Sequence, residues 1–124
     1  DYISKNQIPA LLAKSTIATS LFIDLPEMEN NSANKFFDGL AAGKPIMINY
    51  GGWQADLLKK TGSGFIIPQN DPVGSARIIN NIITDKSKLD LMSKASINLA
   101  EKFSVEKNCK KFLNLIDNGI TKFK

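Results

Sequence analysis

The alternation of short apolar segments with amphipathic ones limits most strongly what this chain can fold into. Residues 16–25, 45–50 and 64–68 are rich in β-branched and large apolar side chains, as buried strands are. The segments around them carry apolar side chains at helical spacing. Strands that alternate with helices form parallel βαβ units with right-handed crossovers. We therefore expect an α/β fold: a partial, Rossmann-like parallel sheet of about three strands with flanking helices.

Helix start and stop signals divide the remaining segments. Ser or Asp caps, Pro at a first helical position and Gly after a last one are the usual markers. They predict one helix from a Ser4–Gln7 capping box to about Lys14, one over residues 33–42 ended by Gly43, one over 53–60 ended by Gly62, one opened by Asp71 and Pro72, and two separated at Ser104.

Apolar stripes predict which faces of the last three helices are buried. We expect each stripe to belong to the core, because its members recur every three or four residues. The stripes are Ile78, Ile79, Ile82 and Ile83; Leu89, Met92, Ala95, Leu99 and Phe103; and Val105, Cys109, Phe112, Leu113, Ile116 and Ile120.

Composition narrows the class of protein. The chain is 43% hydrophobic and 23% charged, so we expect residues 1–124 to form a single domain. Its net charge of +4 comes from scattered lysines that no aromatic side chains interleave, which disfavours nucleic acid as a partner. The single Cys109 and the lack of histidine exclude an internal disulfide, His-based metal sites and His-activated nucleophiles. No apolar run approaches the ~20 residues of a membrane span, so we expect a cytoplasmic protein.

Polar and small residues follow each predicted strand, and a parallel sheet brings these positions to one edge. The carboxyl ends of such strands, and the helix starts that follow them, are where ligands bind in open α/β sheets. The residues expected to converge there are Ser32, Asn34 and Lys35 at one helix start, Gly51 and Gly52 at the next, and residues 69–71 at the third.

The helix over residues 33–42 carries the strongest ligand signal. At about 100° per residue, Asn34, Lys35 and Asp38 share one face, opposite an apolar face. A helix start with basic and amide side chains suits phosphate, and a carboxylate one turn on suits sugar hydroxyls. Plainer interpretations stay open: Ser32 as a helix cap and Lys35–Asp38 as a surface ion pair. Likewise, Gly51–Gly52 is either a simple turn or a close approach to phosphate.

Together these motifs resemble the donor-nucleotide domain of the GT-B glycosyltransferases. The resemblance lies in NSANKFFDGLAAGKPIMINYGG (31–52), TGSGFIIPQND (61–71) and AEKFS (100–104), and it covers nearly the whole chain. It is to the large retaining group that builds bacterial polysaccharides from nucleotide-activated sugars. It implies that this chain is the C-terminal half of a donor domain, and that earlier strands and an N-terminal acceptor domain precede Asp1. Alone, such a piece would be inactive.

The resemblance also implies roles for individual residues. It places Ser32, Asn34 and Lys35 at the donor diphosphate, Asp38 at the ribose, and the Gly51–Gly52 turn beside the donor. Many members have two glutamates eight positions apart. Here the second position is Asp38 and the first is Asn30, so either Asn30 or its neighbour Glu29 would face the donor sugar.

The activity expected from the resemblance is retaining transfer of a sugar from a UDP-sugar to a saccharide or lipid-linked acceptor, with no metal and no further cofactor. Lys35 and the helix dipole would offset charge on the leaving diphosphate. The full-length protein would be cytoplasmic, or peripheral to the inner face of the membrane. Two alternatives remain, a GT-B-like nucleotide-sugar 2-epimerase and a non-enzymatic α/β interaction module. Without its preceding strands, residues 16–25 would form an exposed sheet edge, through which we expect self-association.

Overall fold

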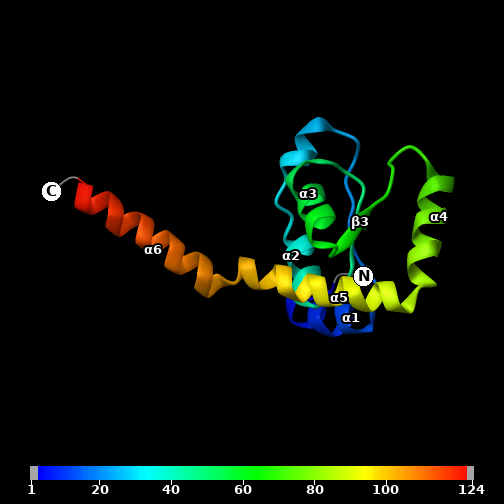
Figure 1. Ribbon diagram of the computed structural model, residues 1–124, viewed down its shortest axis with the longest axis horizontal. Helices are drawn as coiled ribbons and strands as arrows, with labels where there is room; N and C mark the ends of the chain where they lie inside the picture. The colour runs from blue at the N-terminus through cyan, green and yellow to red at the C-terminus, as the bar shows by residue number, and fades with distance from the viewer. Residues whose placement is uncertain (1–2, 123–124) are drawn as a thin grey trace.

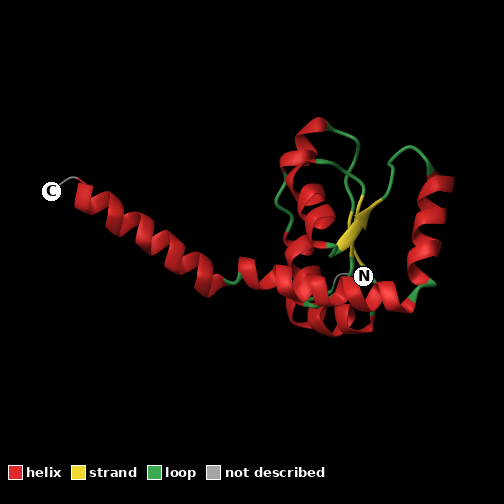
Figure 2. Ribbon diagram, in the orientation of Figure 1, coloured by secondary structure: helices red, strands yellow, loops and turns green. Residues whose placement is uncertain are grey.

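A computed structural model describes residues 3–122 and shows a three-stranded parallel sheet flanked by helices (Figure 2). The strand order is β1-β2-β3, and the register sets Ala18 opposite Ile46 and Ile46 opposite Gly64. The α/β fold and the parallel sheet expected from the sequence are therefore confirmed. The strands are β1 (Ala18–Ser20), β2 (Ile46–Ile48) and β3 (Gly64–Ile66).

Helices occupy most of the remaining chain. The α-helices are α1 (Ile8–Lys14), α2 (Asn34–Ala41), α3 (Gly52–Thr61), α4 (Pro72–Ile83), α5 (Lys86–Ala100) and α6 (Val105–Lys122). Short 3-10 helices are η1 (Lys5–Gln7), η2 (Pro26–Asn30) and η3 (Glu101–Phe103).

The local signals at helix ends act as predicted. Gly62 ends α3 in the left-handed region, at φ 70°, which a residue with a side chain rarely adopts. The Asp71 carboxylate accepts a hydrogen bond of 2.8 Å from the Gly74 N–H and so caps α4. The Ser104 Oγ accepts one of 3.3 Å from the Lys107 N–H at the start of α6. These interactions are short-range, which is why the sequence alone could locate them.

The predicted strand over residues 16–25 is too long. β1 ends at Ser20, and the chain continues as a loop. The backbone of Phe22 shows the reason, because a side chain satisfies it in place of a strand. Its N–H donates to Asn49 Oδ1 at 2.9 Å, and its C=O accepts from Asn49 Nδ2 at 2.8 Å. β2 and β3 are likewise shorter than the predicted segments 45–50 and 64–68.

Two apolar clusters cover the two faces of the sheet. In Figure 1, α2 and α3 lie on one side of β3 and α4 lies on the other. The first cluster joins the sheet to α2, α3 and the end of α5: Ala18, Phe36, Leu40, Ile46, Ile48, Tyr50, Ala55, Leu58 and Leu99. The second joins it to α4 and the middle of α5: Met47, Phe65, Ile67, Ile82 and Met92.

α5 crosses the amino edge of the sheet. The buried Ser96 Oγ donates to the carbonyl oxygens of Lys44, at 2.8 Å, and Ser63, at 3.0 Å, which precede β2 and β3. The predicted α5 stripe is confirmed, since Met92 and Leu99 are buried. α5 therefore leaves the opposite, carboxyl edge of the sheet uncovered.

The apolar stripe of α6 is not part of the core, contrary to prediction. Val105 is 73% exposed and Phe112 is 63% exposed, and the helix extends away from the sheet (Figure 1). Cys109 is also exposed, and the side chain of Ile120 lies outside the described part. The chain passes the last core positions before α6 begins, so its apolar stripe has no sheet surface left to cover. In α4 the stripe is buried in part: Ile82 is buried and Ile83 is exposed.

No helix in the described part of the chain combines the length and apolar character needed to cross a membrane.

Candidate functional site

The packing of α2 determines which of its residues are available to a ligand. Phe36, Gly39 and Leu40 are buried against the sheet. Gly39 permits close contact, because a Cβ at this position would lie 2.7 Å from the Ala18 Cβ. The opposite face, with Asn34, Lys35 and Asp38, is exposed. The predicted division of this helix into a buried and a free face is confirmed.

Lys35 lies at the carboxyl end of β1. Its ammonium group donates to the Leu21 carbonyl oxygen at 3.2 Å and sits 4.4 Å from the centroid of the Phe22 ring. Within residues 3–122, no ion pair joins Lys35 to Asp38. The ammonium is therefore held at the sheet edge by neutral groups, and no carboxylate compensates its charge.

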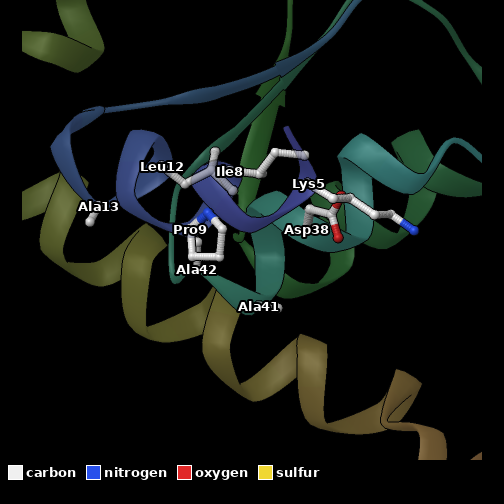
Figure 3. A pocket seen from close by; sticks show the side chains of 8 residues that line it. All are labelled: Lys5, Ile8, Pro9, Leu12, Ala13, Asp38, Ala41 and Ala42. Carbon is white, nitrogen blue, oxygen red and sulfur yellow. The ribbon is translucent and has the colours of Figure 1, made fainter. Parts of the chain in front are cut away.

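Asp38 borders a groove between α1 and α2 (Figure 3). The cavity has a volume of about 390 Å³, and its walls are mostly apolar. Among residues 3–122, its charged side chains are Asp38 and Lys5, which lie near each other at one end, with Ala13 at the other (Figure 3). Such a groove can accept a flat apolar group while the carboxylate accepts hydrogen bonds from hydroxyls. The other lining residues are Ile8, Pro9, Leu12, Ala41 and Ala42.

A second cavity, here called the carboxyl-edge pocket, lies where the loops after the three strands meet. Its volume is about 680 Å³, and its lining is more polar than that of the groove. Among the predicted residues, Gly51 and residues 69–71 line it, together with Glu29. The topological argument therefore located a real hollow. Its charged side chains are Asp24, Glu29, Lys59 and Asp71, and its side-chain amides are Asn49, Gln69 and Asn70.

Glu29 lies directly against the two glycines that open α3. A Cβ on Gly51 would be 2.7 Å from a Glu29 carboxylate oxygen, and one on Gly52 would be 2.2 Å from the Glu29 carbonyl oxygen. Gly52 is thus required by the packing of η2 on α3, because it faces Glu29 backbone, whereas at Gly51 the contact is with the flexible end of the Glu29 side chain. The Trp53 Nε1 holds the same loop by donating to the Asn31 carbonyl oxygen at 3.0 Å. The Glu29 carboxylate therefore faces the amino-terminal end of α3. This end of a helix attracts negative charge.

The remaining predicted residues are on the surface. Asn30, Ser32 and Asn34 are exposed, and none of them lines either cavity. The interpretation of Ser32 as a cap is wrong, because α2 begins one residue later with Ala33 at the cap position and no side chain capping it. The structure therefore distributes the predicted residues over the α1–α2 groove, the carboxyl-edge pocket and the surface between them.

An aromatic pair separates Lys35 from the carboxyl-edge pocket. The rings of Phe22 and Tyr50 meet edge to face, with centroids 5.3 Å apart, and Tyr50 lines the pocket. The buried Tyr50 hydroxyl lies 3.1 Å from the Ser20 Oγ and donates to the Gln54 Oε1 at 2.5 Å. This network fixes the Tyr50 ring, which lines the carboxyl-edge pocket and contacts the Phe22 ring beneath the Lys35 ammonium.

Sequence reasoning missed three charged residues at these sites, Lys5, Asp24 and Lys59. Lys5 lies in η1, within the Ser4–Gln7 capping box, and belongs to no ligand-binding motif, so only the packing of α1 on α2 places it near Asp38. Asp24 falls within the predicted strand over residues 16–25. A shorter strand would have put it in the loop at the carboxyl edge, where ligand-binding residues are expected. Within the described part, no three His, Cys, Asp or Glu side chains are arranged to hold a metal ion.

Comparison with known proteins identifies no relative. No protein-family model, no curated protein and no solved structure matches this chain.

Proposed function

We propose that this chain is the nucleotide-binding half of the donor domain of a retaining glycosyltransferase, and that it binds a UDP-sugar along the free face of α2. The observation that carries the proposal is the placement of two side chains of opposite charge on that face. Lys35 stands at the carboxyl end of β1, and Asp38 stands one turn further on, at the α1–α2 groove.

The nucleoside would occupy the α1–α2 groove. The apolar walls suit a pyrimidine ring, and the Asp38 carboxylate accepts hydrogen bonds from the two ribose hydroxyls. A carboxylate that accepts bonds from hydroxyls contributes more than a neutral acceptor, by roughly a factor of two in bond strength. The volume of about 390 Å³ falls within the usual range for small-ligand sites.

The diphosphate would lie at the start of α2. No side chain caps this helix, so the N–H groups of Asn34 and Lys35 can donate to phosphate oxygens, whereas that of Phe36 already donates to the Ala33 carbonyl oxygen. Within the described part of the chain, the partners of the Lys35 ammonium are neutral, so it can move to a phosphate without breaking an ion pair there. In the transfer reaction, Lys35 and the helix dipole offset the charge that develops on the leaving diphosphate.

The position of β1 agrees with this proposal. It is an edge strand, and ligands in doubly wound sheets bind where the strand order reverses. The preceding strands implied by the GT-B resemblance would pair with the free edge of β1. The point where the strand order reverses would then lie at β1, beside α2. The acceptor, a saccharide or lipid-linked saccharide, and the other catalytic groups would belong to an N-terminal domain of a cytoplasmic or peripheral enzyme.

Calorimetry with UDP on the full-length protein tests the proposal. Replacing Lys35 or Asp38 by Ala should weaken binding about 10- to 100-fold, the usual range for loss of one charged hydrogen bond. The variants Lys60→Ala and Asp56→Ala remove the same charges from exposed positions on α3 that line neither cavity, and should leave binding unchanged. Unaltered UDP affinity in both α2 variants would refute the proposal, and product analysis with and without an acceptor separates transfer from 2-epimerisation.

A further inference from the structure

One side of α6 is apolar and exposed, and it has no role in the nucleotide site described above. The helix extends away from the sheet, so no other element of the described chain packs on this side (Figure 1). A contiguous exposed apolar surface on a folded chain marks an interaction site. The surface is here called the α6 apolar face, and its exposed side chains are Val105, Cys109, Phe112, Leu113, Leu115 and Ile116.

The α6 apolar face is too wide for a single partner helix. At about 100° per residue, Leu113 and Leu115 mark its two borders, and the arc between them covers ~160° of the helix circumference. Among the described side chains, the polar one inside this arc is the uncharged Asn108. A coiled-coil seam is a narrower stripe and persists over about three to four heptads, whereas α6 has 18 residues. Pairing with a second copy of α6 would therefore leave Leu113 and Leu115 in water.

The opposite side of α6 is basic. Lys107, Lys110 and Lys111 are exposed there. Residues 105–124 carry five lysines and two acidic residues, a net charge of +3, so the preceding 104 residues contribute only +1 to the total of +4. The positive charge of the chain is thus concentrated on the segment that carries the apolar face. A basic amphipathic helix of this kind is typical of binding to an anionic lipid surface.

A hollow on the body of the protein continues the α6 apolar face. Val105 lines this cavity, which has a volume of about 480 Å³, lies between α2 and the end of α5 and has mostly apolar walls. Its charged side chains among residues 3–122 are Asp38 and Glu101, and the Glu101 carboxylate lies 3.9 Å from the Lys107 ammonium. The hollow is a second feature, outside α6 for most of its lining, that fits an apolar chain such as the acyl chain of a lipid.

We infer that α6 is a membrane-surface helix that lies in the headgroup region of an anionic bilayer. Its apolar face turns to the acyl chains, and Lys110 and Lys111 turn to the lipid phosphates and to water. The helix lies along the surface for about 27 Å and does not cross the bilayer, because its basic side needs a polar environment. This inference does not depend on the nucleotide site, since no residue of α6 lines the α1–α2 groove.

Flotation of the full-length protein with lipid vesicles tests the charge requirement. We expect binding to vesicles of phosphatidylglycerol and phosphatidylcholine in equal amounts, and much weaker binding to phosphatidylcholine alone. Lys110→Gln together with Lys111→Gln should weaken binding to the anionic vesicles about 30-fold, because each lysine near such a surface contributes about fivefold. The control, Lys86→Gln together with Lys88→Gln, removes two exposed lysines from α5 and should leave binding unchanged.

The same assay tests the apolar face. Phe112→Gln should weaken binding about tenfold, from the loss of one buried apolar side chain. Leu91→Gln makes a comparable change at an exposed position on α5 and should have no effect. Absence of binding to the anionic vesicles, or binding that the α6 variants weaken no more than the α5 controls do, would overturn the inference.

A fluorophore sensitive to its surroundings, attached to Cys109, shows what covers the α6 apolar face. Cys109 is exposed and is the single cysteine of residues 1–124, and cysteines elsewhere in the full-length protein are replaced by Ser. We expect a blue shift of its emission when anionic vesicles are added. In the control, Cys109→Ser with Asn114→Cys, the label lies on the opposite side of α6 and should shift little.

Each other result of the labelling contradicts the inference. Emission from Cys109 that is already blue-shifted without vesicles, and that vesicles do not change, means that a protein surface covers the face: another domain if the shift is independent of protein concentration, a second copy if dilution abolishes it. Equal shifts at the two positions, or none at either, mean that α6 does not lie on the bilayer with its apolar face inward. UDP binding is measured separately, so the nucleotide site can stand or fail whatever the vesicles show.

Discussion

The fit of α2 on the sheet can be tested by adding one methyl group. In Gly39→Ala the new Cβ would lie 2.7 Å from the Ala18 Cβ and 2.7 Å from the Ile46 Cδ1, both closer than carbon atoms approach in folded proteins. The Ile46 methyl can rotate a little, but the Ala18 Cβ is fixed to β1. We therefore expect α2 to move outward, and Lys35 and Asp38 with it.

Two opposing effects determine the magnitude. Ala in place of Gly in a helix interior stabilises the helix by about 1 kcal/mol. Overpacking of a close-packed core costs about 1–3 kcal/mol, and the immobile neighbour Ala18 puts this site at the upper end. The net expectation is a loss of about 2 kcal/mol in the free energy of unfolding, which for a small domain lowers the urea midpoint by about 1 M.

Gly119→Ala is the matched control. It makes the same substitution in the last turn of α6, where a Cβ would meet no atom within 4 Å. Only the helix-propensity term acts there, so its urea midpoint should stay the same or rise. Circular dichroism during urea unfolding measures both variants. If Gly39→Ala proves as stable as the unmodified protein, or if the two variants change stability alike, the close contact between α2 and β1 is not as described.

The remaining predictions concern the amino edge, a helix cap and the open sheet edge. Ser96→Ala should lower the free energy of unfolding by about 1–3 kcal/mol, because the part-buried Lys44 carbonyl oxygen loses the Ser96 donor and the Ser63 carbonyl oxygen keeps only its bond from the Ile46 N–H. Ser93→Ala on the same helix should change it by less than about 0.5 kcal/mol. Asp71→Ala should cost about 1 kcal/mol of stability and Asp71→Asn only a few tenths, both measured by thermal unfolding, because Asn also caps helices. The isolated chain should self-associate through the open edge of β1 and the exposed side chains of Leu21 and Ile23. Ile23→Lys should reduce this association. A single monomer peak of the unmodified chain in size-exclusion chromatography at high concentration would contradict the prediction.

Local features of the fold were predictable because their causes lie within a few residues. The cap at Asp71 and the left-handed Gly62 depend on backbone geometry over a single turn, and the structure has both as predicted. The same holds for the two faces of α2, since helical periodicity alone separates Asp38 from Leu40. Periodicity also identified three strand segments and, through their alternation with helices, a parallel sheet.

Features that depend on partners distant in the sequence were not predictable in this way. Whether the chain after Ser20 continues as a strand depended on Asn49, which takes the backbone bonds of Phe22. The apolar stripe of α6 is as regular as that of α5, yet only α5 has a sheet edge to cover.

The same distinction applies to the candidate site. The sequence determined that Lys35 and Asp38 share a free face of one helix, and that loops after the three strands meet at one edge. Only the tertiary structure decided that Asp38 borders a groove with α1, that Glu29 occupies the helix start at Gly51, and that the pocket between the loops is acidic. The physical reason is that periodicity and capping are properties of one segment, whereas the lining of a cavity is the sum of several segments whose distances only packing sets.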